Sequence, residues 1–146
     1  NFKGAGRRFE VYGECNGALV VDDYAHHPTE LRATITTAKE MGYKRLIVVH
    51  QPFTYSRTKM LFNDFVDVLK IPDITVLTPI MGSREPNDPT ITSAKLAAQI
   101  PGAVLVDGLK EAADWVKQNA QPGDLVLTLG CGDIYKAGKM MVADAQ

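Results

Sequence analysis

One dense cluster of side chains in this sequence could do chemistry, Asp22-Asp23-Tyr24-Ala25-His26-His27-Pro28-Thr29-Glu30. Burying its polar groups without partners would cost roughly 2–7 kcal/mol for each group, so packing alone does not explain it. The carboxylates could accept from ribose hydroxyls or bind a cation, and the imidazoles could hold a carboxylate or move a proton. The structural alternative is a solvated turn before a helix, with Thr29 or Asp23 as the N-cap. A cap needs only one such residue, so we expect a functional site here.

A second polar stretch is His50-Gln51-Pro52-Phe53-Thr54-Tyr55-Ser56-Arg57-Thr58. Pro52 disfavours a helix directly before it, which predicts a loop over the first residues of the stretch. Arg57 would then lie near the start of the following helix, where its guanidinium could bind a carboxylate or phosphate with two parallel bonds. A surface arginine beside a loop is the alternative.

Two further segments leave their role open. Residues 79–89 predict a long loop that contains Arg84-Glu85, a pair that could contact a ligand or simply be solvated. In Gly130-Cys131-Gly132-Asp133 the glycines permit either tight packing or the binding of an anion at a helix start. Tyr135 stands where a dinucleotide fingerprint would have its third glycine, and no GxxxxGK[ST] loop occurs.

Apolar runs and helical spacings predict the elements that position these segments. Five β-branched runs predict strands buried on both faces of a parallel sheet: 18–21, 46–49, 74–77, 103–106 and 124–127. Between them, spacings near 3.6 predict helices marked by Leu31/Ile35/Ala38, Leu61/Phe65/Val68/Leu69, Leu96/Ile100, Leu109/Ala112/Ala113/Val116 and Ala137/Met140/Met141. The fold class is therefore α/β, an open, mostly parallel Rossmann-like sheet with helices on both faces. Ligands of such sheets bind beyond the carboxyl ends of the strands, which is where the polar segments fall.

The composition is that of one ordinary globular domain, with 45% hydrophobic and 23% charged residues in a chain of 146. Sixteen basic residues nearly balance seventeen acidic ones, so nothing favours nucleic acid or an anionic membrane as the partner. No apolar run approaches the roughly 20 residues of a membrane span. Cys15 and Cys131 match no zinc spacing, and we expect two buried, free thiols. The start at Asn1-Phe2 suggests a piece of a longer protein.

These motifs, in this order, resemble the C-terminal domain of the Mur ligase family. The likeness spans nearly the whole chain, and the run from Asp22 to Glu30 is its most specific part. Tyr24 favours the branch that adds L-alanine, because murein peptide ligases tend to have Phe there. The other matching segments are Gly4-Ala5-Gly6-Arg7-Arg8-Phe9-Glu10, Gln51-Pro52, Tyr55-Ser56-Arg57-Thr58, Arg84-Glu85-Pro86 and Gly130-x-Gly132-Asp133-Ile134.

The resemblance implies a bacterial cytoplasmic enzyme of peptidoglycan synthesis. Its substrates would be UDP-N-acetylmuramate, L-alanine and ATP; ATP with Mg²⁺ would activate a carboxylate as an acyl phosphate, which the alanine amine then attacks. Residues 1–146 would form the C-terminal domain, with 1–14 as a linker leading into it or an edge strand. The UDP-binding and central ATPase domains would lie outside this sequence, so the chain alone would be inactive and would work against its own central domain.

Site residues follow from the resemblance by position. Arg8 and Asp23 correspond to nucleotide contacts, with Asp23 accepting from ribose hydroxyls. His26 and Arg57 correspond to catalytic groups that hold the incoming alanine, and Tyr24 and His27 to further substrate-binding neighbours. No residue is expected to bind a metal. Some members have a second arginine at the position of Thr54, so alanine would depend more heavily on Arg57 here.

Two other classes of function stay open on the sequence alone. The Asp/His cluster could bind a divalent metal in a stand-alone phosphoesterase, although the adjacent His26 and His27 would normally point in different directions. The chain could also be a non-catalytic nucleotide-binding or interaction module.

Overall fold

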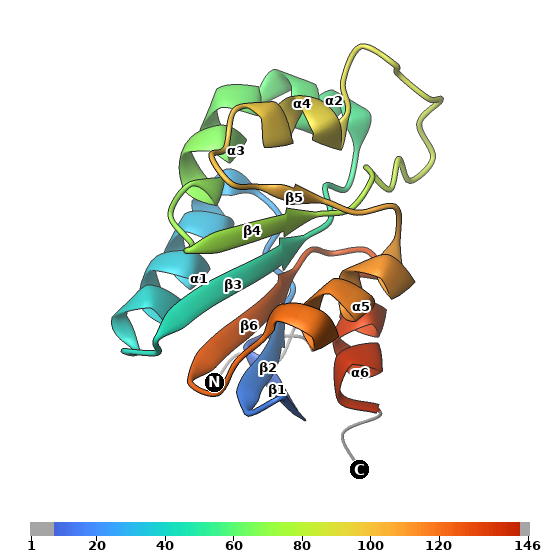
Figure 1. Ribbon diagram of the computed structural model, residues 1–146. Helices are drawn as coiled ribbons and strands as arrows, with labels where there is room; N and C mark the ends of the chain where they lie inside the picture. Colours follow the sequence, from blue (N-terminus) through green and yellow to red (C-terminus); the bar gives the residue numbers. More distant parts are fainter. Residues whose placement is uncertain (1–7, 144–146) are drawn as a thin grey trace.

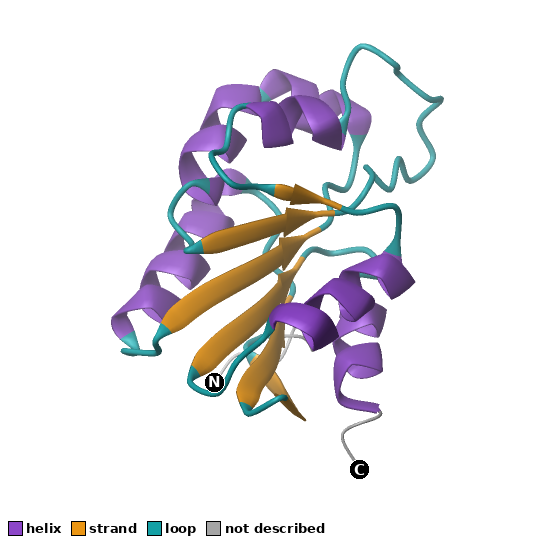
Figure 2. Cartoon of the chain, in the orientation of Figure 1, coloured by secondary structure: helices purple, strands orange, loops and turns teal. Residues whose placement is uncertain are grey.

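The computed structural model describes residues 8–143, which form a single β-sheet with helices packed on both of its faces (Figures 1 and 2). The sheet has six strands in the order β1-β2-β6-β3-β4-β5, parallel except for the edge strand β1, which runs antiparallel to β2. The predicted fold class is confirmed. The elements are β1 (Glu10–Cys15), β2 (Ala18–Asp23), α1 (Pro28–Glu40), β3 (Arg45–His50), α2 (Tyr55–Met60), α3 (Phe62–Leu69), β4 (Ile74–Leu77), α4 (Ser93–Ala98), β5 (Val104–Leu105), α5 (Leu109–Asn119), β6 (Asp124–Leu129) and α6 (Tyr135–Ala143).

Alternate residues of the central strands supply two separate apolar cores. Val21, Val48 and Leu127 face helices α1, α3 and α4 on one side of the sheet. Val20 and Val126 face α5 and α6 on the other. Because strand side chains alternate between faces, both faces of an apolar run must be covered, and the helices do this.

The predicted strands and helices are present, with several differences. The strand predicted at 103–106 is shortened to Val104–Leu105, and α4 ends before the buried Ile100. The helix predicted around Leu61 is two helices, α2 and α3, which break at Leu61 with φ −106° and ψ 27°. Residues 10–15 form an edge strand, whereas residues 1–7 of the predicted linker lie outside the described part of the chain.

The first helix begins differently from either capping alternative. Its N-cap is His27, whose Nδ1 accepts from the backbone N–H of Thr29 at 3.2 Å. Thr29 does not cap it because Thr29 is already the second helical residue, and Asp23 instead accepts from the backbone N–H groups of Phe9 and Ala25, which lie outside the helix. Glu30 accepts from the backbone N–H of His27 and completes a capping box. The polar cluster therefore serves partly as a helix start.

Three strands end at the same level, and this level carries the polar segments. Leu129 of β6 pairs with Asp23 of β2 on one side and with His50 of β3 on the other.

Cys15 is buried, and burial raises the pKa of its thiol, whereas Cys131 beyond the end of β6 is only half-buried. The expectation of two buried thiols is thus right for Cys15 alone. No helix between residues 8 and 143 has the length and apolarity needed to cross a bilayer.

Candidate functional site

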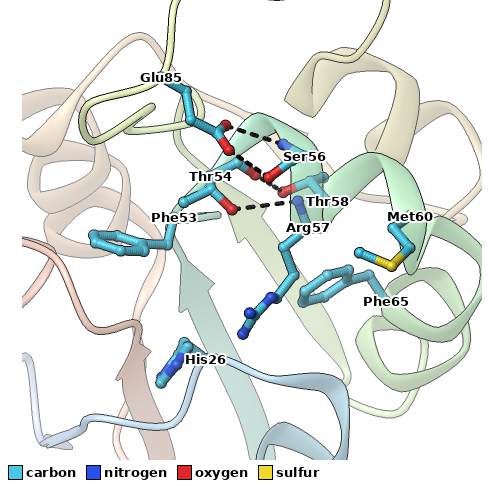
Figure 3. A pocket seen from close by; sticks show the side chains of 9 residues that line it. All are labelled: His26, Phe53, Thr54, Ser56, Arg57, Thr58, Met60, Phe65 and Glu85. Atoms are coloured by element: carbon cyan, nitrogen blue, oxygen red, sulfur yellow. Dashed lines mark hydrogen bonds between the residues drawn. The ribbon is translucent and has the colours of Figure 1, made fainter.

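His26 and Arg57, predicted from two different strand ends, line one cavity of about 350 Å³ (Figure 3). His26 follows β2 and Arg57 lies in the first turns of α2, after β3. The guanidinium of Arg57 extends from α2 toward His26 and past the ring of Phe65. The remaining lining residues are Phe53, Thr54, Ser56, Thr58, Met60 and Glu85. The cavity thus combines a guanidinium and an imidazole with apolar walls.

The first turn of α2 is fixed on several sides, which positions Arg57. Thr54 caps the helix, its Oγ1 accepting from the backbone N–H of Arg57 at 3.3 Å. Glu85 accepts from the backbone N–H of Ser56 at 3.0 Å and from its hydroxyl. These Ser56 bonds hold the pKa of Glu85 below its ordinary value. Within residues 8–143 the guanidinium of Arg57 has no hydrogen-bond or ion-pair partner, so it can bind an anionic ligand.

Glu85 is a lining residue whose role the sequence left open, and Thr54 was noticed only for an absent arginine. Ser56 and Glu85 lie 29 residues apart, and no local pattern predicts their contact. The prediction of a loop around Pro52 was the available signal, since it placed the strand end and the start of α2 at the same edge of the sheet.

Asp23 and Arg8 line a second cavity, of about 300 Å³, together with Phe9, Ala33, Thr34 and Thr37. Asp23 is 4% exposed. Its Oδ1 accepts from the backbone N–H of Ala25 and its Oδ2 from that of Phe9, both at 2.9 Å. A carboxylate has about four acceptor positions, so two bonds leave capacity for hydroxyl donors. Arg8 and Asp23, the two predicted nucleotide contacts, therefore line the same cavity. His26 and Arg57 line a different one.

Tyr24 and His27 are neighbours of the first cavity and line neither of the two. Tyr24 is 37% exposed, and its ring meets the ring of His26 edge-on, with centroids 5.7 Å apart. The Nδ1 of His27 is occupied by the capping bond to Thr29. The adjacent histidines have different surroundings, as expected from their sequence positions.

His50 is a buried polar residue that the sequence analysis assigned no role. It is 1% exposed and stacks on Phe65 of the cavity wall, with ring centroids 6.1 Å apart. Its Nδ1 lies 3.0 Å from the carbonyl oxygen of Leu129, and its Nε2 has no partner among residues 8–143. Burial lowers the pKa of His50 to about 4, so the ring is neutral near pH 7.

The segment Gly130-Cys131-Gly132-Asp133 is packed against the loop that follows β3. A Cβ on Gly132 would lie 2.5 Å from the Sδ of Met81 and 2.6 Å from the Oε1 of Gln51. Gly130 has a φ of 154°, and a Cβ there would lie 3.2 Å from the carbonyl oxygen of Gln51. Close packing thus accounts for both glycines. Between residues 8 and 143 there is no group of three or more His, Cys, Asp or Glu side chains that could hold a metal ion.

Comparisons with known proteins agree with the geometry. The family model for the glutamate ligase domain of the Mur ligases matches residues 7–132. The UDP-N-acetylmuramate–L-alanine ligase of Lachnospira eligens is 46% identical, over 95% of this chain and 31% of its own length. That of Acetivibrio thermocellus is 41% identical, over 100% of this chain and 32% of its own length. The chain spans about a third of the length of these relatives.

Among solved structures, the UDP-N-acetylmuramate–alanine ligase of Thermotoga maritima superposes with a TM-score of 0.76 and 25% identity. The match covers 99% of this chain and 31% of that one. Because the family model covers most of the sequence and the fold agrees, the chain belongs to the Mur ligase family and carries its glutamate ligase domain.

Proposed function

We propose that this chain is the C-terminal domain of a UDP-N-acetylmuramate–L-alanine ligase. The observation that carries the proposal is the convergence of His26 and Arg57 on one cavity. Two relatives at 41% and 46% identity have this name, which supports the choice of reaction.

L-Alanine suits this cavity chemically. The planar guanidinium of Arg57 can meet its carboxylate with two parallel bonds, and the ring of His26 faces the same space. Phe53, Met60 and Phe65 provide apolar walls for a methyl group. Bound in this way, the amine is the free end of the molecule, ready to attack an activated carboxylate.

The nucleotide would lie against the second cavity, which Arg8 and Asp23 both line. ATP supplies the phosphoryl group that converts the lactyl carboxylate of UDP-N-acetylmuramate into an acyl phosphate. Arg8 offers donors to phosphate and Asp23 offers acceptors to ribose hydroxyls. Residues 8–143 contain no group of three or more His, Cys, Asp or Glu side chains that could hold Mg²⁺, so this part of the chain would not supply the metal's ligands. The remaining domains of the ligase would bind it, and the cytoplasm would supply both nucleotide substrates.

A chimera tests the proposal directly. This chain would replace the matching C-terminal third of the Lachnospira eligens ligase, and phosphate release from ATP would be followed with UDP-N-acetylmuramate and L-alanine. We expect turnover that needs both substrates and is lost in Arg57→Ala. Arg32→Ala is the matched control, because Arg32 is an exposed arginine of α1 that lines neither cavity.

Two results would contradict the proposal. A folded chimera that uses the tripeptide L-alanyl-γ-D-glutamyl-meso-diaminopimelate in place of L-alanine would place the chain among the murein peptide ligases. A folded chimera with no turnover on either acceptor would exclude both ligase reactions.

A further inference from the structure

Glu30 contacts His26 without lining the cavity that His26 faces. Its Oε1 accepts from the backbone N–H of His26 at 3.2 Å and from that of His27 at 3.3 Å. The same oxygen lies 3.4 Å from the Nδ1 of the His26 ring. Burial raises the pKa of Glu30, but the two backbone N–H groups, with His26 and Arg8, outweigh burial and hold it below its ordinary value. Glu30 is therefore an ionised acceptor beside the ring.

The surroundings of the ring determine which nitrogen of His26 carries the proton. Besides Glu30, the carbonyl oxygen of Tyr24 lies 3.3 Å from Nδ1. A carboxylate and a carbonyl can only accept hydrogen bonds, so Nδ1 must donate in either contact. In the neutral ring Nε2 is then the nitrogen with the free lone pair, and the Tyr24 ring packed edge-on at 5.7 Å limits rotation.

We propose that Glu30 is a positioning residue that holds His26 in the Nδ1–H form, with Nε2 presented to the cavity it shares with Arg57. This deepens the proposed function, since an Nε2 held in this way can accept a proton from an amine or donate to a carboxylate once charged. The assignment of the proton itself rests on the contacts of Glu30 and Tyr24 and needs no ligand.

The other histidines provide internal references, because the sequence has three in all. The Nδ1 of His27 accepts from the backbone N–H of Thr29, so its proton is on Nε2. The Nδ1 of His50 faces the carbonyl oxygen of Leu129, so His50 has the Nδ1–H form. The structure therefore assigns one histidine to the Nε2–H form and two to the Nδ1–H form.

Long-range ¹H–¹⁵N NMR of the histidine rings, on the 146-residue chain at alkaline pH, tests the proposal. In the unmodified chain we expect His26 mainly as Nδ1–H, opposite to His27. In Glu30→Ala the Nδ1–H fraction of His26 should fall, because only the carbonyl oxygen of Tyr24 then remains as an acceptor, while His50 stays unchanged. Glu30→Gln retains an acceptor oxygen at this position and should restore much of the Nδ1–H form.

His27→Ala separates positioning of the ring from helix capping. It removes the side-chain cap of α1 but leaves the carboxylate of Glu30 beside His26. A change in His26 as large as that in Glu30→Ala would show that Glu30 acts only by starting the helix, and would overturn the proposal. So would a predominantly Nε2–H His26 in the unmodified chain. Because no substrate is present, either result leaves the ligase reaction to the chimera assay, and an inactive chimera leaves the proton assignment intact.

Discussion

Gln51 and Asp133 exchange two hydrogen bonds across the ends of neighbouring strands. The Nε2 of Gln51 donates to the Oδ1 of Asp133 at 2.8 Å, and the backbone N–H of Asp133 donates to the Oε1 of Gln51 at 3.2 Å. Gln51 follows β3 and Asp133 precedes α6, so the pair joins the loop that leads to Arg57 with the loop beyond β6. The loop that leads to Arg57 is thus held by the Gln51–Asp133 contact, although neither of these two residues lines the cavity of Arg57.

Gly132→Ala should disrupt this exchange. The new Cβ would lie 2.5 Å from the Sδ of Met81 and 2.6 Å from the Oε1 of Gln51, so both side chains must shift, and the shift of the amide weakens its bond to the backbone N–H of Asp133. Overpacking of this kind costs about 1–3 kcal/mol. Denaturant unfolding of the chain measures the loss. Gly108→Ala is the matched control: its Cβ would meet only a side-chain oxygen of Glu111, and we expect a change below about 1 kcal/mol. Equal losses in both variants would contradict the role of the exchange.

Arg57→Lys should damage alanine use although the charge is kept. A lysine is a point charge on a flexible stem and cannot make the two parallel bonds of a guanidinium. Thr54 caps α2 and provides no second cation to compensate. We expect kcat/KM for alanine in the chimera to fall by about tenfold or more, with acyl-phosphate formation less affected because it precedes amine attack. Unchanged alanine kinetics and isotope exchange would show that Arg57 is a surface residue.

Asp23→Ala should have two separate effects. The backbone N–H groups of Phe9 and Ala25 lose their acceptor, which should lower the free energy of unfolding by about 1–3 kcal/mol. In the chimera the KM for ATP should rise more than the KM for alanine, since Asp23 lines the cavity proposed for the nucleotide and not the one proposed for alanine. Asp23→Asn keeps one acceptor oxygen and should lose less stability. A raised KM for alanine beside an unchanged KM for ATP would show that the role is misassigned.

His50 should make stability depend on pH in a defined window. Its pKa is about 4 when folded and 6.5 ordinarily, so the unfolded chain binds more protons between these values. The stabilisation is complete above pH 6.5 and is lost as the pH falls toward 4. Relative to His50→Phe, the unmodified chain should lose about 2 kcal/mol between pH 7 and pH 5. Leu129 keeps the backbone N–H of Gln51 as a donor in the variant. Parallel pH profiles of the two proteins would contradict the low pKa.

The sheet could be predicted from the sequence because each central strand is an apolar run that can be recognised without knowing its pairing partners. The runs at 18–21, 46–49 and 124–127 are buried strands, and the polar residues that follow them meet at one edge, as the parallel arrangement requires. Local spacing also placed Arg57 at the start of a helix.

The details that escaped prediction depend on contacts between residues far apart in the sequence. Glu85 reaches Ser56 across 29 residues, and Gln51 reaches Asp133 across 82, so no local pattern contains either bond. The cap of α1 was missed for another reason. Histidine is not among the residues preferred at N-caps, and Thr29, two residues later, is a stronger candidate by propensity. Here Thr29 instead donates its backbone N–H to the His27 ring.

The segment from Asp23 to His27 separates the two cavities, with Asp23 on one side and His26 on the other. It is short and internally bonded, since the Oδ1 of Asp23 accepts from the backbone N–H of Ala25. Any coupling between ligands in the two cavities would be reciprocal: if a nucleotide changed the affinity for an amino acid by some factor, the amino acid would change the affinity for the nucleotide by the same factor. If the two cavities hold the two proposed substrates, this five-residue segment is a short covalent connection through which the binding of one could affect the binding of the other.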